Sequence, residues 1–392
     1  EGRSSCNFFR SLGLDYLYVG EGNDIPSLIA AFAKVKDTSR PTVVHIHTQK
    51  GKGYAPAEAD REEFHWEMPF DLETGKPKVD CSGMEDYHSL TGKFLLEKMK
   101  EDHTVVAISS GTPTVIGFTP ERRKQAGRQF VDVGIAEEHA VALASGIAAG
   151  GGRPVYGVYS TFVQRCYDQL SQDLCINGNP AVITVFMGTV AGMNDVTHLG
   201  FFDIPLISNI PNMVYLAPTC SEEYFAMLEW AVRQTEYPVA IRVPGAAVVH
   251  RKEEFDTDYS ELNRYKMTAR GETVAILALG SFYDLGQALK NKLREESGVE
   301  ATLINPRYIT GLDEPMLEEL KVGHRIVVTL EDGVLDGGFG EKIARYYGNS
   351  EMRVLNYGLR KEFADRYNLD ELMKANRLTD KQMAEDIAGI LG

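Results

Sequence analysis

The chain has 392 residues, of which 43% are hydrophobic and 25% are charged. This composition predicts a globular protein with enough chain for two or three domains. The net charge of −15 argues against a nucleic-acid partner, which would need a basic face. No apolar run approaches the roughly 20 residues that cross a bilayer, so we expect no membrane partner.

Five cysteines are scattered along the chain, and no two of them have the Cys-x-x-Cys spacing of a zinc or redox site. Their odd number also argues against a disulfide framework. The first residues, EGRSSCNFF, lack the pattern of a secretory signal. Together these features predict a cytoplasmic protein with reduced thiols.

The first fifty residues predict a short helix at 8–12, a strand at 16–19, a helix at 25–35 and a strand at 42–47. Asp24 is a suitable N-cap for the longer helix. Two strands with one or two helices cannot cover both faces of a parallel sheet. We therefore expect the rest of this domain to come from residues upstream of Glu1 or from a separate chain.

The stretch that follows, to about residue 80, is polar, contains three prolines and predicts an interdomain linker. Lys50 and Lys52 flank Gly51 in the sequence TQKGKGY. They can contact a phosphate group, but a lysine-glycine turn on the surface has the same pattern. His65 is similarly ambiguous, because a single histidine in a linker often has no chemical role.

Residues 81–250 alternate between predicted strands and helices. The strands are expected at 104–109, 130–133, 154–159, 181–186, 214–217 and 239–242, and the main helices at 89–99, from residue 137, at 169–175 and at 221–233. This alternation predicts a doubly wound, mostly parallel sheet. Ligands bind beyond the carboxyl ends of the strands in such sheets. Glu137, Phe162, His198 and Arg242 follow on, or lie close to, such strand ends.

Two carboxylates, Glu137 and Glu138, open the helix that follows residue 133. They can belong to a site, or they can simply favour the helix N-terminus through its dipole. The sequence alone leaves both interpretations open.

Residues 251–392 form a third unit with predicted strands at 273–279, 301–304 and 326–330 and a helix at 286–296. The glycine-rich stretch EDGVLDGGFGEKIA follows the last of these strands. It lacks the spacing of a dinucleotide-binding or phosphate-binding loop, so it predicts a closely packed turn from strand to helix.

Five motifs in this order carry a resemblance to a known family: TQKGKGY, IAEEHAV, YSTFVQRCYDQ, THLGFFD and EDGVLDGGFG. The sequence resembles the 1-deoxy-D-xylulose-5-phosphate synthases, which are transketolase-like thiamine diphosphate enzymes. The resemblance extends from about residue 8 to near the C-terminus. It implies a thiamine-diphosphate-binding fold followed by a transketolase C-terminal-like domain.

The resemblance also implies the domain plan and the ligands. Residues 1–80 resemble the last part of a diphosphate-binding domain plus its linker, 81–250 a pyrimidine-binding domain, and 251–392 a C-terminal domain. The cofactors would be thiamine diphosphate and Mg²⁺, with the metal and diphosphate ligands upstream of residue 1. The substrates would be pyruvate and an aldose phosphate, and the expected assembly is a homodimer.

The site residues that the resemblance implies fall into three groups. Glu137 would hydrogen-bond to N1′ of the cofactor aminopyrimidine, Phe162 would stack on that ring, and His198 would handle protons on substrate oxygens. Glu138 would keep only its helix-capping role. His65 would be a further catalytic residue, and Tyr159, Arg165 and Lys50 would bind the cofactor. Arg242, Asp168 and Asn194 would bind the substrate, Arg242 through its phosphate.

Three places depart from the family pattern, the first being Glu21-Gly22-Asn23-Asp24, where the family usually has aspartate-glycine-histidine-aspartate. Met187 stands where an arginine is expected, and Gly245 replaces the second arginine of a five-residue motif that in this chain reads IRVPG. Arginine binds phosphate through bidentate, charge-assisted hydrogen bonds. Three functions therefore stay open: the synthase reaction, a transketolase-like transfer with another donor or acceptor, and a non-catalytic chain without the diphosphate site.

Overall fold

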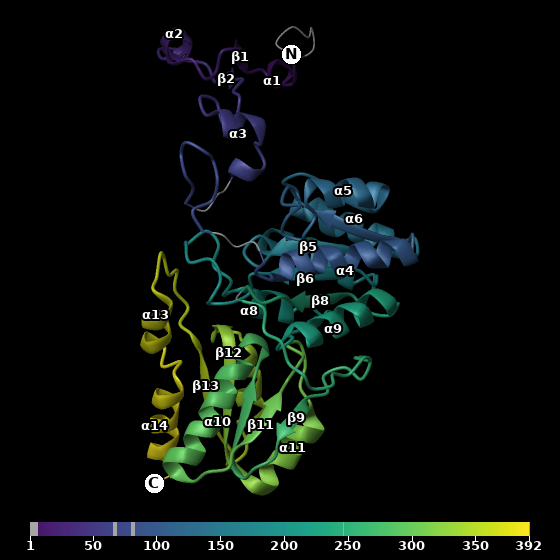
Figure 1. Cartoon of the computed structure of the whole chain (residues 1–392), viewed down its shortest axis with the longest axis vertical. Helices are drawn as coiled ribbons and strands as arrows, with labels where there is room; N and C mark the ends of the chain where they lie inside the picture. The colour runs from purple at the N-terminus through teal and green to yellow at the C-terminus, as the bar shows by residue number, and fades with distance from the viewer. Residues whose placement is uncertain (1–6, 66–68, 80–82, 246, 392) are drawn as a thin grey trace. The chain divides into compact units, whose positions relative to one another are not determined.

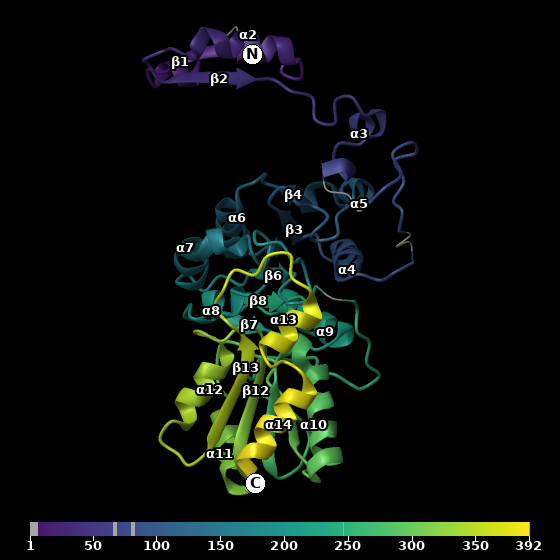
Figure 2. The same ribbon diagram turned by 90° about the vertical axis from the view of Figure 1, so that its left-hand side faces the viewer.

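The computed structural model describes residues 7–65, 69–79, 83–245 and 247–391. The chain divides into two compact units, Glu1–Met84 and Glu85–Gly392. The ribbon in Figures 1 and 2 shows both from two sides, and each unit is described by itself.

The first unit is a single β-α-β arrangement. Strands β1 (Asp15–Val19) and β2 (Thr42–Ile46) pair in parallel, and helix α2 (Ile25–Val35) connects them. The carboxylate of Asp24 accepts a hydrogen bond from the backbone N–H of Ser27 at 2.9 Å, so the predicted cap is present. The remaining helical pieces are short: α1 (Phe8–Ser11), α3 (Ala55–Ala59) and a turn at Glu63–His65.

One face of α2 is apolar yet exposed. Ile25, Ile29 and Phe32 are 68%, 64% and 50% exposed, and their spacing places them along one side of the helix. Buried apolar side chains are few in this unit. Its strands and helix therefore form with little burial to support them.

The second unit begins with a six-stranded, wholly parallel sheet in the order β4-β3-β5-β6-β8-β7. This confirms the predicted doubly wound, mostly parallel fold. Its strands are β3 (Val105–Ser109), β4 (Phe130–Asp132), β5 (Arg153–Tyr159), β6 (Val182–Phe186), β7 (Val214–Leu216) and β8 (Val239–Arg242). Its helices are α4 (Tyr87–Glu101), α5 (Pro120–Ala126), α6 (Glu137–Ala149), α7 (Tyr167–Gln169, continued by a wider turn to Cys175), α8 (Asp203–Ser208) and α9 (Ser221–Arg233).

A second sheet has the order β13-β12-β10-β11-β9 and is parallel except at its β9 edge. Its strands are β9 (Lys266–Ala269), β10 (Thr273–Ala278), β11 (Thr302–Asn305), β12 (His324–Val334) and β13 (Arg353–Leu359). The helices are α10 (Tyr283–Ser297), α11 (Glu314–Gly323), α12 (Phe339–Tyr347), α13 (Leu369–Ala375) and α14 (Asp380–Leu391). Helix α14 lies beside α10 on one face of this sheet (Figures 1 and 2).

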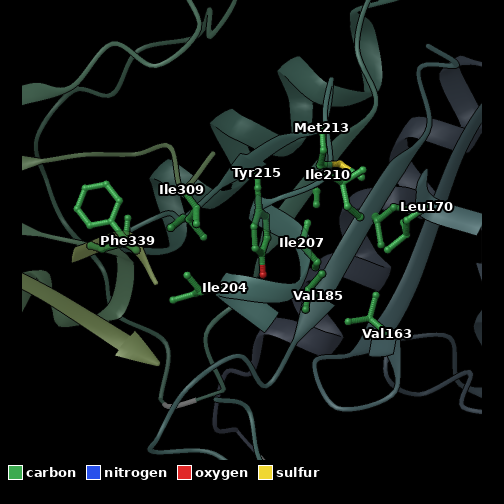
Figure 3. Packing of buried hydrophobic residues seen from close by; sticks show 14 of the residues in the cluster. Val163, Leu170, Val185, Ile204, Ile207, Ile210, Met213, Tyr215, Ile309 and Phe339 are labelled. Atoms are coloured by element: carbon green, nitrogen blue, oxygen red, sulfur yellow. The ribbon is translucent and has the colours of Figure 1, made fainter. Parts of the chain in front are cut away.

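One hydrophobic cluster of the second unit contains side chains of both sheets. Tyr215 of β7 is fully buried between Ile207 of α8 and Ile309, which follows β11 (Figure 3). Phe339, the first residue of α12, belongs to the same cluster. Buried side chains of both sheets are thus in continuous contact, so the second sheet can hold parts of the first in place.

Candidate active site

Glu137 is a buried acid at the first position of α6. Its side chain is only 3% exposed, and the N-cap residue, Ala136, offers no side-chain cap. Oε2 lies 2.9 Å from Nη1 of Arg165, but the angle does not make a hydrogen bond. Within the described ranges, no group donates a hydrogen bond to this buried oxygen, which leaves it open to an outside donor.

Glu138 is chemically equivalent but differently placed. Its side chain is 40% exposed, and its Oε1 lies 3.5 Å from Nε of Arg165. One guanidinium therefore faces both glutamates. Burial, rather than position in the sequence, distinguishes the two acids.

Three aromatic rings gather beyond the carboxyl end of β5. The centroid of Phe162 lies 5.6 Å from that of Tyr159 and 5.3 Å from that of His198. Tyr159 and His198 are 6.4 Å apart, and burial raises the pKa of Tyr159 above its usual range. Arg165 follows Phe162 by three residues, so this short segment joins the ring cluster to Glu137.

His88 also belongs to this neighbourhood, although no sequence motif indicates it. Its ring stacks on Phe186 at 4.8 Å and lies edge-on to Tyr159 at 6.3 Å. Nδ1 lies 2.7 Å from the carbonyl oxygen of Val115. Burial lowers the pKa of His88, which favours the neutral imidazole.

His198 is held by its own loop. Nδ1 lies 3.1 Å from Oδ1 of Asp195 and 2.8 Å from the hydroxyl of Thr197. The hydroxyl of Thr161 donates to the carbonyl oxygen of Thr197 at 3.0 Å. The pKa of Asp195 is lowered by hydrogen bonds, first from Thr197 and then from His198. An ionised acceptor at Nδ1 leaves Nε2 as the nitrogen available to a ligand.

Arg242, expected to bind a substrate phosphate, is instead buried inside the protein. It donates through Nε to Asp203 at 2.6 Å and through Nη2 to the carbonyl oxygens of Gly200 and Asp332 at 3.1 and 2.5 Å. Burial opposes its charged form, but Asp203 and Asp332 outweigh burial and raise the pKa of Arg242 above its usual range. This geometry gives Arg242 a structural role and does not support phosphate binding.

The other expected residues are more scattered. Asp168 is exposed in α7, and Asn194 is exposed with its amide donating to the carbonyl oxygen of Tyr367 at 3.1 Å. Lys50 and His65 contact each other in the first unit, through Nζ and Nδ1. The structure thus brings Glu137 and Arg165 together, joins Tyr159, Phe162 and His198, and pairs Lys50 with His65.

Comparison with known proteins gives these contacts a context. The family described as "Transketolase, pyrimidine binding domain" matches residues 85–248, and "Transketolase, C-terminal domain" matches residues 264–383. The chain belongs to the transketolase family.

Several relatives with curated names are 1-deoxy-D-xylulose-5-phosphate synthases. That of Clostridium acetobutylicum is 34% identical over 378 residues, which cover 94% of this chain and 59% of the relative. That of Alkaliphilus oremlandii is 35% identical over 383 residues, which cover 97% and 60%. The chain therefore spans about 60% of the length of the curated relatives it matches.

Solved structures support the same fold at lower identity. A split-gene transketolase, described as an inactive beta4 tetramer, matches with a TM-score of 0.65 and 20% identity over 77% of this chain and 96% of that chain. A transketolase of Pichia stipitis, in complex with sedoheptulose 7-phosphate, matches with a TM-score of 0.63 and 14% identity over 97% and 67%. These likenesses establish the fold of the transketolase family for this chain.

Met187 and Gly245, the two positions where the family pattern has arginine, are neighbours in space. A Cβ atom on Gly245 would lie 2.6 Å from the sulfur of Met187, and one on Gly200 would lie 1.9 Å from the carbonyl oxygen of Met187. Met187 itself has a φ of 58°, a left-handed conformation that is uncommon for methionine. The methionine side chain thus packs over the glycine, where the family pattern would place two arginines.

The described part of the chain gathers no group of three or more His, Cys, Asp or Glu side chains that could hold a metal ion. Among the same residues, no helix is both long and apolar enough to cross a membrane.

Proposed function

We propose that this chain forms the pyrimidine-binding and C-terminal domains of a cytoplasmic thiamine-diphosphate-dependent transferase. The proposed reaction condenses pyruvate with glyceraldehyde 3-phosphate, with loss of CO2, to give 1-deoxy-D-xylulose 5-phosphate, a precursor for isoprenoid and thiamine synthesis. The observation that carries the proposal is the buried Oε2 of Glu137, which has no hydrogen-bond donor among the residues described. The names of the curated relatives support the choice of reaction.

The residues present fit the aminopyrimidine half of thiamine diphosphate. Glu137 would share a proton with N1′ of the ring, because its open, buried oxygen needs a partner of that kind. Phe162 would stack on the ring face, and Arg165 would keep Glu137 oriented from 2.9 Å away. When bound, the cofactor supplies an electron sink for the two-carbon unit of the substrate.

His198 would serve the substrate side of the same site. With Asp195 on Nδ1, its Nε2 can deliver a proton to a substrate oxygen or remove one. Tyr159 borders this histidine. Lys50 and His65 remain proposed contributors, and the proposed ligands of Mg²⁺ and the diphosphate lie upstream of residue 1 or on another chain.

The decisive experiment measures CO2 release from pyruvate in the presence and absence of glyceraldehyde 3-phosphate. With the full-length protein, thiamine diphosphate and Mg²⁺, we expect release that depends on the aldose phosphate, and no release would overturn the proposal. The variant Glu137→Gln should lower turnover by about 10²- to 10⁴-fold, the usual contribution of general acid–base groups.

The matched control is Glu138→Gln, which removes the same charge one residue later at an exposed position. We expect its turnover to stay within about twofold of the parent. Near-normal turnover of Glu137→Gln, with an unchanged circular dichroism spectrum, would overturn the assignment of Glu137.

A second candidate function rests on the Met187–Gly245 contact. An arginine lost from a phosphate site weakens binding by about 1.5–3 kcal/mol, the value of a hydrogen bond to a charged group. The chain would then transfer a two-carbon unit between other sugars, as a transketolase does. Exchange between xylulose 5-phosphate and ribose 5-phosphate without pyruvate would favour this reaction over the first.

A third possibility is that the chain binds the cofactor weakly or not at all and is not catalytic. Calorimetric titration with thiamine diphosphate and Mg²⁺ distinguishes it, because tight binding would contradict it. We also propose a homodimer, since the exposed small residues of α6, Gly146 and Ala149, allow close packing against a second copy. Sedimentation analysis tests that state directly.

A further inference from the structure

The loop that carries His198, residues 187–202, joins β6 to α8. Between these two elements the described chain forms no helix or strand. Holding such a loop in one conformation costs conformational entropy at every residue that is fixed. Contacts from outside the loop must therefore fix it, and the C-terminal domain supplies them.

Tyr367, between β13 and α13, contacts the first half of the loop. Its hydroxyl donates to the carbonyl oxygens of Val190 and Met193 at 2.7 and 3.3 Å. Its ring lies 5.9 Å from that of Phe201. Burial raises the pKa of Tyr367 to about 12, so the hydroxyl keeps its proton and remains a donor near neutral pH.

The two residues before Tyr367 contact the middle of the loop. The backbone N–H of Val196 donates to Oδ1 of Asp365 at 3.1 Å, and the N–H of Arg366 donates to the carbonyl oxygen of Asn194 at 2.6 Å. The amide of Asn194 donates back to the carbonyl oxygen of Tyr367 at 3.1 Å. All three partners, Asp365, Arg366 and Tyr367, come from the segment 365–367.

The base of the loop is also tied to this domain, through β12. Oδ1 of Asp332 accepts a hydrogen bond from the N–H of Val190 at 2.7 Å. The N–H of Val334 donates to the carbonyl oxygen of Phe201 at 3.0 Å. The C-terminal domain therefore holds the loop near both of its ends as well as in its middle.

These contacts flank Asp195, the residue whose carboxylate contacts His198. Asp195, whose carboxylate lies 3.1 Å from Nδ1 of His198, stands between Asn194 and Val196. Both neighbours are hydrogen-bonded to the segment 365–367. A shift of that segment would move Asp195 and turn the imidazole with it.

We infer that Tyr367 and Asp365 are positioning residues, through which the C-terminal domain holds His198 in its working orientation. The inference rests on the proposed function, because it assumes that His198 transfers a proton during turnover. It gives the C-terminal domain a direct part in a site whose chemical groups lie in the domain before it.

The test variant is Tyr367→Phe, which removes the hydroxyl and keeps the ring. Its matched control is Tyr357→Phe, because the hydroxyl of Tyr357 donates to Asp386 within the same domain and away from the loop. We expect kcat of Tyr367→Phe to fall about three- to tenfold, the effect of one lost hydrogen bond, with KM for pyruvate within about twofold. Tyr357→Phe should match the parent.

A double variant separates positioning from general damage. If Tyr367 acts through His198, adding Tyr367→Phe to His198→Ala should cause no further loss of kcat. An additive loss would contradict the inference. At the second contact, Asp365→Asn should restore most of the activity lost in Asp365→Ala, because the asparagine keeps an oxygen for the N–H of Val196.

Two further readouts separate this inference from the proposed function. Exchange of the cofactor C2 proton depends on Glu137 and should be unchanged in Tyr367→Phe. If the parent protein shows no such exchange, the proposed function is wrong, but the positioning role of Tyr367 is not contradicted. Amide hydrogen exchange of residues 190–198 should rise about three- to tenfold in Tyr367→Phe and not in Tyr357→Phe. Unchanged exchange in this loop would overturn the positioning role, whatever the enzyme does.

Discussion

The two units of the chain use the same alternation of strand and helix but differ in what covers them. In the first unit, the apolar face of α2 is exposed, with Ile29 64% accessible. In the second, three clusters of buried side chains cover both sheets, and Leu277 is fully inaccessible. Local sequence signals therefore suffice to form a β-α-β arrangement, whereas burial determines how firmly it is held.

Buried charge should show the largest difference between the units. Arg242→Ala would leave Asp203 buried without its partner, and losing one member of a buried ion pair costs about 3–5 kcal/mol. The matched variant in the first unit is Arg40→Ala, which breaks an exposed pair with Asp15 and should cost less than about 1 kcal/mol. Hydrogen exchange in increasing urea, read peptide by peptide, measures each unit separately. Equal losses of stability in Arg242→Ala and Arg40→Ala would contradict the difference in burial between the two units.

Truncating a buried leucine is the next largest effect. Leu277→Ala, in β10, removes a side chain with no solvent exposure and should destabilise the second unit by about 2–5 kcal/mol. Leu72→Ala makes the same change in the first unit at a position that is 75% exposed, and we expect it to be nearly neutral. Urea denaturation of both variants, followed by the same exchange measurement, gives the two values. A small effect at Leu277 would mean that its surroundings collapse into the cavity.

Most of the fold could be predicted because its elements carry strong local patterns. Helix α2 begins and ends where the Asp24 cap and the apolar spacing place it. Two strands at the edges of the second sheet, β9 (Lys266–Ala269) and β13 (Arg353–Leu359), were not predicted. Both are only partly buried, so neither has the continuous apolar run that marks a central parallel strand.

The candidate site was predictable only in part. The motifs indicated Glu137, Phe162 and His198, but no pattern could show that Glu137 is buried while Glu138 is exposed. The phosphate-binding role predicted for Arg242 is not supported, because a cation after a strand has the same sequence signature whether it faces a ligand or a buried Asp203. His88 was missed because its partners, such as Phe186, lie far away in the sequence.

The pH dependence of stability should be a property of the second unit. Burial raises the pKa of Glu331 to about 7, despite hydrogen bonds from the N–H groups of Gly340 and Phe339 and the nearby charges of Arg242 and Lys342. The folded protein therefore keeps this proton over a range where the unfolded chain has lost it. Stability should fall by up to about 3 kcal/mol as pH rises from about 4.5 to 7.

Urea denaturation at pH 5 and pH 8 measures this loss, and Glu331→Gln is the control. The glutamine cannot ionise, so the difference between the two pH values should shrink in the variant. In the first unit, the pKa of Asp24 is lowered by hydrogen bonds from Ser27, and this carboxylate is exposed. An equal fall of stability in the variant and the parent would show that other groups cause it.

The smallest effect should come from the apolar face of α2. Ile29→Ala exchanges a largely exposed β-branched side chain for the best helix former, which favours the helix by about 0.4 kcal/mol. Little burial is lost in return, so exchange of residues 14–47 should slow slightly or stay the same. Lys34→Ala, an exposed change in the same helix, is the matched control for propensity alone. If Ile29→Ala instead speeds exchange more than tenfold while Lys34→Ala does not, then Ile29 is covered in solution. The two units would then differ less in burial than the isolated chain indicates, and the cover of α2 would come from another molecule or another segment.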